Sequence, residues 1–309
     1  MNARFFPIIF LAVGLSFPGL AAESLKPLRI LTVGNSFAYN ATRFLPELAA
    51  STGRQVQIAS ANFRGCSLEL HWKTAQAAEA GRQEGAIYPP ATKGGAKRSL
   101  RDFLRDGPWD IITIQQASPL SNDPSSYRPF GPDLAAYIRR YAPDAEIVVH
   151  QTWAYRSDDP RFKDGATPAA MHEAIRRAYR SLADELGARL VPVGDAFAIA
   201  GADPQWTYRP DPDFDPAAMR YPDVPPQPHS LHVGWRWFVK PTGTKFALDA
   251  RHANLFGQYL GSCVFFEFLF GQSVVGNPFV PPGITAGQAR SLQEAAHQAV
   301  ASARPKPAA

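Results

Sequence analysis

Ser36, Asp249 and His252 are the residue types that carry out nucleophilic acyl transfer. Ser36 follows an apolar run, Arg29 to Val33, and a Gly34-Asn35 turn, so it lies where a strand ends. A serine attacks an acyl carbon when a base removes its proton, and a carboxylate that orients the base assists it. Asp249 and His252 are three residues apart, a spacing that puts both side chains on one side of a loop or helical turn. The three residues together indicate serine catalysis, whereas Ser36 alone could equally cap the following helix.

Strands and helices alternate along the chain, which is the pattern of a parallel sheet covered by helices. The predicted strands are 29–33, 55–59, 109–114, 145–150 and 188–193. The predicted helices are 41–50, 68–84, 99–106, 132–141 and 167–186. The sequence therefore predicts an α/β fold, a three-layer α/β/α sandwich around a central parallel sheet of five strands. Ligands bind at the carboxyl ends of such strands, which is where Ser36 lies.

Composition indicates an ordinary globular protein, with 45% hydrophobic and 19% charged residues in a chain of 309. We expect one domain over residues 23–309. The net charge of +5 is not concentrated in a basic run, so nothing supports nucleic-acid binding. The alternation breaks over residues 201–243, which are rich in proline and aromatic residues and predict a folded insertion. From Thr244 we expect a helix that carries Asp249 and His252.

Residues 1–22 have the features of a secretory signal peptide. Arg4 supplies the positive start, Phe5 to Leu20 the apolar region, and Ala21-Ala22 the small residues of a cleavage site. We therefore expect a periplasmic or extracellular protein with no stable membrane insertion after cleavage; a retained anchor is the alternative. Export would place Cys66 and Cys263 in an oxidising compartment, where we predict a cystine between them; two buried free thiols are the alternative.

The block Gly34-Asn35-Ser36-Phe37 resembles the first motif of the SGNH (GDSL-like) serine hydrolase superfamily. Within this superfamily, the block is most similar to that of one branch, a domain of unknown function, whose members have Gly-Asn-Ser-Phe in place of Gly-Asp-Ser. Gly65 is similar to the glycine of the second motif, and Asp249 and His252 match the closing Asp-x-x-His. The resemblance spans Ile30 to Pro282 and implies an SGNH, flavodoxin-like fold. It also implies Ser36 as the nucleophile, with His252 and Asp249 completing a triad.

The third motif departs from this family. Superfamily members have Gly-x-Asn there, and the asparagine completes the oxyanion hole; here the strand ends in Gln115-Gln116-Ala117-Ser118. The resemblance implies an oxyanion hole of the Ser36 and Gly65 backbone N–H groups. The third donor would be the amide of Gln115, with Gln116 as the alternative.

Four residues near the expected site are candidates for substrate binding: Asn35, His71, Trp153 and Trp235. His71 follows Gly65 closely, so it either lines a cleft or lies on a helix surface. Trp235 alternates with Trp237, so one face could be core and the other a platform for a sugar.

His229 and His232 have a spacing close to that of metal ligands. No cysteine or carboxylate cluster accompanies them, and a metal site needs three or four ligands. We therefore expect no metal and no cofactor.

The sequence thus predicts an exported serine esterase that removes acyl groups, in the simplest case O-acetyl groups, from carbohydrate. Its partner would be a small-molecule or polysaccharide ester. The carbohydrate part depends on export, on the aromatic insertion and on the resemblance. The alternatives are a lipase or thioesterase of the SGNH type, an acyltransferase that uses the same residues, and a non-catalytic polysaccharide-binding protein that keeps the fold.

Overall fold

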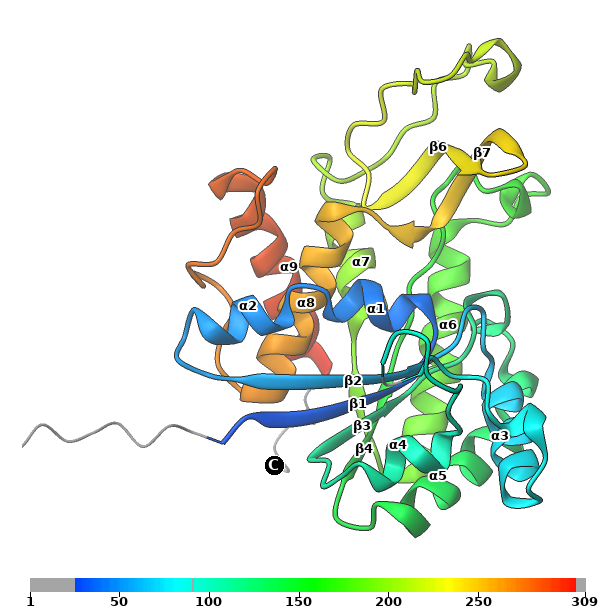
Figure 1. Ribbon diagram of the computed structural model, residues 1–309. Helices are drawn as coiled ribbons and strands as arrows, with labels where there is room; N and C mark the ends of the chain where they lie inside the picture. Colours follow the sequence, from blue (N-terminus) through cyan, green and yellow to red (C-terminus); the bar gives the residue numbers. More distant parts are fainter. Residues whose placement is uncertain (1–25, 91, 304–309) are drawn as a thin grey trace, which may run out of the picture.

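A five-stranded parallel sheet lies at the centre of the molecule (Figure 1). The computed structural model describes residues 26–90 and 92–303. The strand order is β2-β1-β3-β4-β5, and every neighbouring pair is parallel. The strands are β1 (Leu28–Gly34), β2 (Val56–Asn62), β3 (Ile111–Ile114), β4 (Glu146–His150) and β5 (Arg189–Val191). The predicted α/β class and five-stranded sheet are confirmed.

Helices cover both faces of this sheet and complete the three-layer sandwich (Figure 1). One layer contains α1 (Ser36–Thr42), α2 (Leu45–Ala50), α7 (Val193–Ala202), α8 (Leu255–Phe270) and α9 (Ala286–Ala303). The other contains α3 (Leu68–Glu79), α4 (Leu100–Arg105), α5 (Phe130–Tyr141) and α6 (Pro168–Leu186). Because both faces are covered, the central strands are continuous apolar runs, and all four residues of β3 are buried.

The register of β1 and β2 positions the candidate nucleophile. Gly34, the last residue of β1, lies opposite Asn62, the last residue of β2. The Phe63 N–H then donates to the Gly34 carbonyl at 3.1 Å. The two loops that follow these strands, one with Ser36 and the other with Gly65, therefore leave the sheet side by side.

The expected helix from Thr244 is wrong, because residues 243–253 form strand β7 (Gly243–Ala253). It pairs in antiparallel register with β6 (His232–Lys240) across the two-residue turn Pro241-Thr242. The helix starts only at Leu255, where the Asn254 side chain accepts from the Gly257 N–H and caps α8. The alternation of large and polar residues on both strands is the pattern of a β-hairpin. The proline-rich and aromatic composition of the segment obscured this pattern.

The aromatic residues of the expected insertion hold an irregular loop on this hairpin. Trp235 and Trp237 are two residues apart and therefore share one face of β6. Phe214 packs edge-on against Trp235, and Tyr221 against Trp237. The Trp237 indole N–H also donates to the Asp223 carbonyl at 2.7 Å. The face that could have been a sugar platform is therefore covered by the chain's own loop.

Besides α8, three regions have helices that differ from the sequence-based expectation, and one of them is α9 (Ala286–Ala303), where no helix was expected. The helix expected over 41–50 is two short helices, of which α1 begins at Ser36 and α2 has Pro46 in its first turn. Helix α7 follows β5 directly, where no helix was expected. Asp195 lies in its first turn, so its carboxylate is close to a helix N-terminus rather than free at a strand tip.

The predicted signal peptide, residues 1–22, lies outside the described residues. Among the residues that are described, no helix is both long and apolar enough to cross a membrane.

Cys66 and Cys263 are both buried as free thiols, so the prediction of a cystine between them is wrong. Cys66 follows the turn after β2, and Cys263 lies inside α8. Burial raises the pKa of the Cys66 thiol to about 12, and it raises the pKa of Cys263 further. Thiolate is the reactive form, so both groups are inert in the folded protein.

We expect that Ellman's reagent finds no reactive thiol in the native protein and two in the denatured protein. The reason is that both sulfurs are fully buried and protonated. Titration with and without guanidinium chloride measures this. A denatured protein that releases thiols only after treatment with a reductant would contradict it.

Candidate active site

Ser36, His252 and Asp249 form one continuous set of hydrogen bonds. The Ser36 hydroxyl oxygen lies 2.9 Å from Nε2 of His252, and His252 Nδ1 lies 2.8 and 3.0 Å from the two Asp249 carboxylate oxygens. A carboxylate only accepts, so the ring proton lies on Nδ1 and Nε2 accepts from the serine hydroxyl. The predicted trio is therefore brought together in the arrangement that activates a serine.

A bulge in β7 makes this spacing work on a strand. Between the pairs His232–Ala253 and Gly234–Asp249, β7 has two residues more than β6. In a regular strand, residues three apart would point to opposite faces. The bulge turns the His252 ring back toward Asp249, as extra residues in a ladder do near active sites.

Asp249 is held as a carboxylate. Burial opposes its ionisation, but the hydrogen bonds from the His252 ring and backbone, together with the ring's charge, outweigh burial. The pKa of Asp249 consequently lies below its ordinary value. The carboxylate is 11% exposed, whereas the ring of His252 is 35% exposed, so the ring remains accessible to a substrate.

Asn35 joins the nucleophile to the neighbouring loop. Its side-chain oxygen accepts from the Phe37 N–H at 3.0 Å and caps α1, which starts at Ser36. Its amide N–H donates to the Cys66 carbonyl at 3.0 Å. One buried side chain thereby holds Ser36 beside the turn that contains Gly65.

Gly65 lies at the third position of a turn closed by the Cys66 N–H, which donates to the Phe63 carbonyl at 3.0 Å. Its φ of +68° is in the left-handed region, which glycine adopts without strain. In the part of the chain that is described, neither the Ser36 N–H nor the Gly65 N–H has an acceptor. These two groups are available to an oxyanion.

Neither glutamine reaches the site as an oxyanion donor, so that prediction is corrected. The amide of Gln115 donates to Asn35 Oδ1 at 3.0 Å and its oxygen lies 2.9 Å from Nδ1 of His150. The amide of Gln116 donates to Ser126 and its oxygen accepts from the Leu68 N–H. Both glutamines are fully buried. Their longer side chains fold back into the protein instead of pointing at a ligand.

Gln115 therefore supports the site indirectly, through its hydrogen bond to Asn35. A Cβ at Gly34 would lie 2.8 Å from the Gln115 side chain, so only glycine leaves room for it. His150 is the last residue of β4, and Gln115 is the first residue after β3. Because Ile114 is paired with Val149, the register of these strands puts Gln115 and His150 side by side. His150 was not predicted from the sequence, although polar residues ending two adjacent strands were a signal for such a pair.

The segment after β4 supports the bulge that carries His252. The Trp153 indole N–H donates to the Arg251 carbonyl, and the Arg156 N–H donates to the Ala250 carbonyl, each at 2.9 Å. Trp153 also stacks on Phe37, the residue after the nucleophile, with ring centroids 4.3 Å apart. Trp153 thus contacts both the residue after the nucleophile and the bulge that carries His252.

The four candidates for substrate binding do not line the site. Asn35, His71 and Trp153 are buried, and His71 is bonded to the Tyr88 hydroxyl and the Gly34 carbonyl. Trp235 packs against Phe214, as described above.

The two histidines with ligand-like spacing are bonded separately. Nδ1 of His229 lies 3.0 Å from the Gln205 carbonyl, and Nε2 of His232 lies 3.0 Å from the Ala154 carbonyl. Each of these two ring nitrogens is hydrogen-bonded to a different backbone carbonyl.

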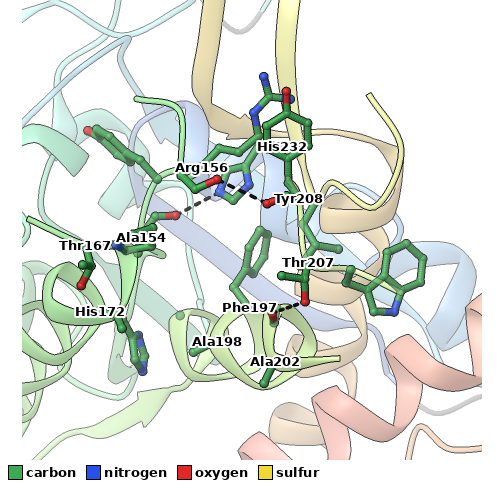
Figure 2. A pocket seen from close by; sticks show the side chains of 18 of the residues that line it. Ala154, Arg156, Thr167, His172, Phe197, Ala198, Ala202, Thr207, Tyr208 and His232 are labelled. Atoms are coloured by element: carbon green, nitrogen blue, oxygen red, sulfur yellow. Dashed lines mark hydrogen bonds between the residues drawn. The ribbon is translucent and has the colours of Figure 1, made fainter. Parts of the chain in front are cut away.

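A cavity of about 500 Å³ lies behind the site (Figure 2). Its walls include Phe197, Trp206 and Leu231, and none of Ser36, Asp249 and His252 lines it. Phe197 stacks on Trp153 with ring centroids 4.5 Å apart, so this aromatic pair stands between the cavity and Phe37. Figure 2 shows the His232 ring bonded to the Ala154 carbonyl in the cavity wall.

The fold and the site define an α/β/α sandwich with a Ser–His–Asp set at the carboxyl edge of its sheet. A family model described as "Domain of unknown function (DUF4886)" matches residues 29–184, and the chain belongs to this family. The family expected from the Gly-Asn-Ser-Phe block, a domain of unknown function, is thereby confirmed. No curated protein matches the chain significantly.

Solved structures resemble the chain to different extents. A DUF4886 family protein from Bacteroides uniformis is 26% identical with a TM-score of 0.68, covering 89% of this chain and 95% of that one. A protein described as a candidate SGNH hydrolase from Slackia heliotrinireducens has 19% identity and a TM-score of 0.48, covering 78% and 98%. A mutant of an acetyl-xylooligosaccharide esterase from Geobacillus has 10% identity and a TM-score of 0.42, covering 79% and 95%. The last two likenesses are too distant to bear on activity.

We expect acid to destabilise the fold through His71 and His150. Burial lowers the pKa of His71 to about 4, with the Gly34 carbonyl opposing, and burial lowers that of His150 to about 3. In the unfolded chain both rings take up a proton near pH 6.5. Stability is therefore lost as the pH falls from about 6.5, by about 2 kcal/mol per histidine between pH 7 and pH 5.

Urea denaturation at several pH values measures this loss. His71→Gln keeps a donor to the Gly34 carbonyl but cannot titrate, so it should have a flatter pH dependence than the wild type. An unchanged slope in that variant would show that His71 does not take part.

We expect Gln115→Met to lower the free energy of unfolding by about 2 kcal/mol, because it leaves the buried His150 N–H without an acceptor. It should also slow labelling of Ser36 by a fluorophosphonate, since Asn35 loses a hydrogen bond. Gln76→Met, on the exposed side of α3, is the matched control. Equal stability and labelling in both variants would contradict the role of Gln115.

Proposed function

We propose that the protein is an exported serine esterase that hydrolyses O-acyl esters, in the simplest case O-acetyl esters, of carbohydrate. The observation that carries the proposal is the 2.9 Å contact between the Ser36 hydroxyl and His252, whose other ring nitrogen is held by Asp249. A serine, a neutral imidazole and a buried carboxylate in this order generate a nucleophile.

The mechanism is a two-step acyl transfer. Ser36 Oγ forms a bond to the ester carbon while its proton passes to His252 Nε2, and the carbonyl oxygen becomes an oxyanion. The Ser36 and Gly65 N–H groups stabilise this charge. The intermediate then expels the alkoxide, which takes the proton from His252 and leaves as the alcohol. Water attacks the acyl-serine by the same route and releases the carboxylic acid.

The position of the site favours a short acyl group on a large alcohol. The apolar cavity is not lined by Ser36 or His252, so it provides no tunnel for a long chain beside the nucleophile. The ring of His252 is one-third exposed, which leaves room for an alcohol as large as an oligosaccharide. Export, expected from the N-terminal residues, is consistent with a polysaccharide substrate outside the cytoplasm.

We expect the mature protein to hydrolyse p-nitrophenyl acetate and to be labelled by a fluorophosphonate at Ser36. Ser36→Ala should abolish both, and Asp249→Asn should lower kcat by about ten-thousandfold, because the imidazole loses its orienting carboxylate. Ser181→Ala, on the exposed side of α6, is the matched control. Hydrolysis assays and peptide mapping of the labelled protein measure these outcomes.

Three outcomes would redirect the proposal. Equal turnover by the wild type and Ser36→Ala would remove it. Glycan binding without labelling of Ser36 would favour a non-catalytic polysaccharide-binding protein. A strong preference for octanoate over acetate esters would favour a lipase or thioesterase.

A further inference from the structure

The hairpin that carries Asp249 has a second face, opposite its aromatic one. Residues directly paired across an antiparallel ladder point to the same side. The pairs Gly234–Asp249, Arg236–Ala247 and Phe238–Lys245 therefore share one face, which we call the basic face. Its charged groups besides Asp249 are Arg236 and Lys245, followed at the tip by Lys240.

The basic face extends outward from the candidate active site. Arg236 lies opposite Ala247, two residues beyond Asp249, and Lys245 lies four residues beyond Asp249 on the same strand. At about 3.3 Å per residue, these positions are about 7 and 13 Å from Asp249 along the strand. Both side chains are exposed. They are placed to meet a substrate that extends away from its ester group along the hairpin.

Two exposed arginines are also sequence neighbours of site residues. Arg64 precedes Gly65, and Arg251 precedes His252. Arg251 is partly neutralised by Asp159, 3.9 Å away, whereas Arg236 and Lys245 take part in none of the ion pairs found over residues 26–90 and 92–303.

The acidic residues of this region lie on the other side of the hairpin. The segment 211–223 contains four aspartates, and it packs on the aromatic face through Phe214 and Tyr221. On the basic face the single carboxylate is Asp249, which is bonded to His252. The hairpin therefore separates charge, with the positive side on the face of the catalytic pair.

We propose that the ester substrate is anionic, with a carboxylate on the part that extends from the ester along the hairpin, where it binds to Arg236 and Lys245. This inference rests on the proposed esterase function and names its substrate class, an acylated acidic sugar. An arginine can bind a carboxylate through two parallel hydrogen bonds, and a lysine adds a second positive charge.

The test compares two forms of one substrate, an acetylated oligogalacturonate with free carboxylates and the same oligosaccharide with its carboxylates methyl-esterified. The ratio of kcat/KM values for acetate release, free acid over methyl ester, should be about three- to tenfold in the wild type. The double variant Arg236→Gln/Lys245→Gln should bring the ratio close to one. Lys97→Gln, the same change on an exposed loop before α4, should preserve it. Added salt should lower the wild-type ratio, because it screens exposed charges.

The outcomes separate this inference from the proposed function. A wild type that hydrolyses p-nitrophenyl acetate but shows a ratio near one overturns the anionic substrate alone. A preference for the free acid that persists in the double variant overturns the role of Arg236 and Lys245. A wild type that cleaves no ester overturns both the esterase function and this inference.

Discussion

The hydrogen bond between Ser36 and His252 joins residues 216 positions apart, and the rest of the structure serves to bring them together. Ser36 starts a short helix at the end of β1, while His252 lies on a bulge at the end of β7. The Asn40 side chain accepts from the Ala253 N–H at 3.1 Å and so ties that helix to the strand. Trp153 adds a second link, through its stack on Phe37 and its bond to the Arg251 carbonyl. The contact thus depends on tertiary packing through these two links.

At the carboxyl edge of the sheet, a buried hydrogen-bond network takes the place of the third oxyanion donor of the superfamily pattern. A glutamine stands where the superfamily pattern has an asparagine, and its side chain is buried behind the nucleophile rather than exposed in front of it. There it links His150 to Asn35, and Asn35 links the Ser36 turn to the Gly65 turn. A buried polar group without a hydrogen bond costs free energy. This network therefore holds the backbone N–H groups of Ser36 and Gly65 in one arrangement.

The β6–β7 hairpin combines two functions because a strand has two faces. One face packs aromatic side chains against the 203–231 loop, which gives the hairpin a small core of its own. The other carries Asp249 and a row of exposed basic groups. The cavity behind Trp153 has the chemistry of neither face. Its wall is mostly apolar, and none of Ser36, His252 and Asp249 lines it.

The sequence by itself determined the sheet and all five strand positions to within a few residues, and its resemblance to a known family pointed to Ser36, Gly65, Asp249 and His252 as the residues of the site. The strand positions follow from local patterns, namely apolar runs and turn residues. Only the tertiary structure decided that Asp249 and His252 lie on a bulged strand, that Gln115 is buried, and that Cys66 and Cys263 are apart. Each of these depends on which distant segment packs against the residue, for example His150 against Gln115, and a bulge depends on the register of a partner strand. Contacts of this kind are fixed by how segments far apart in the sequence pack together, so the neighbouring residues of the chain do not determine them.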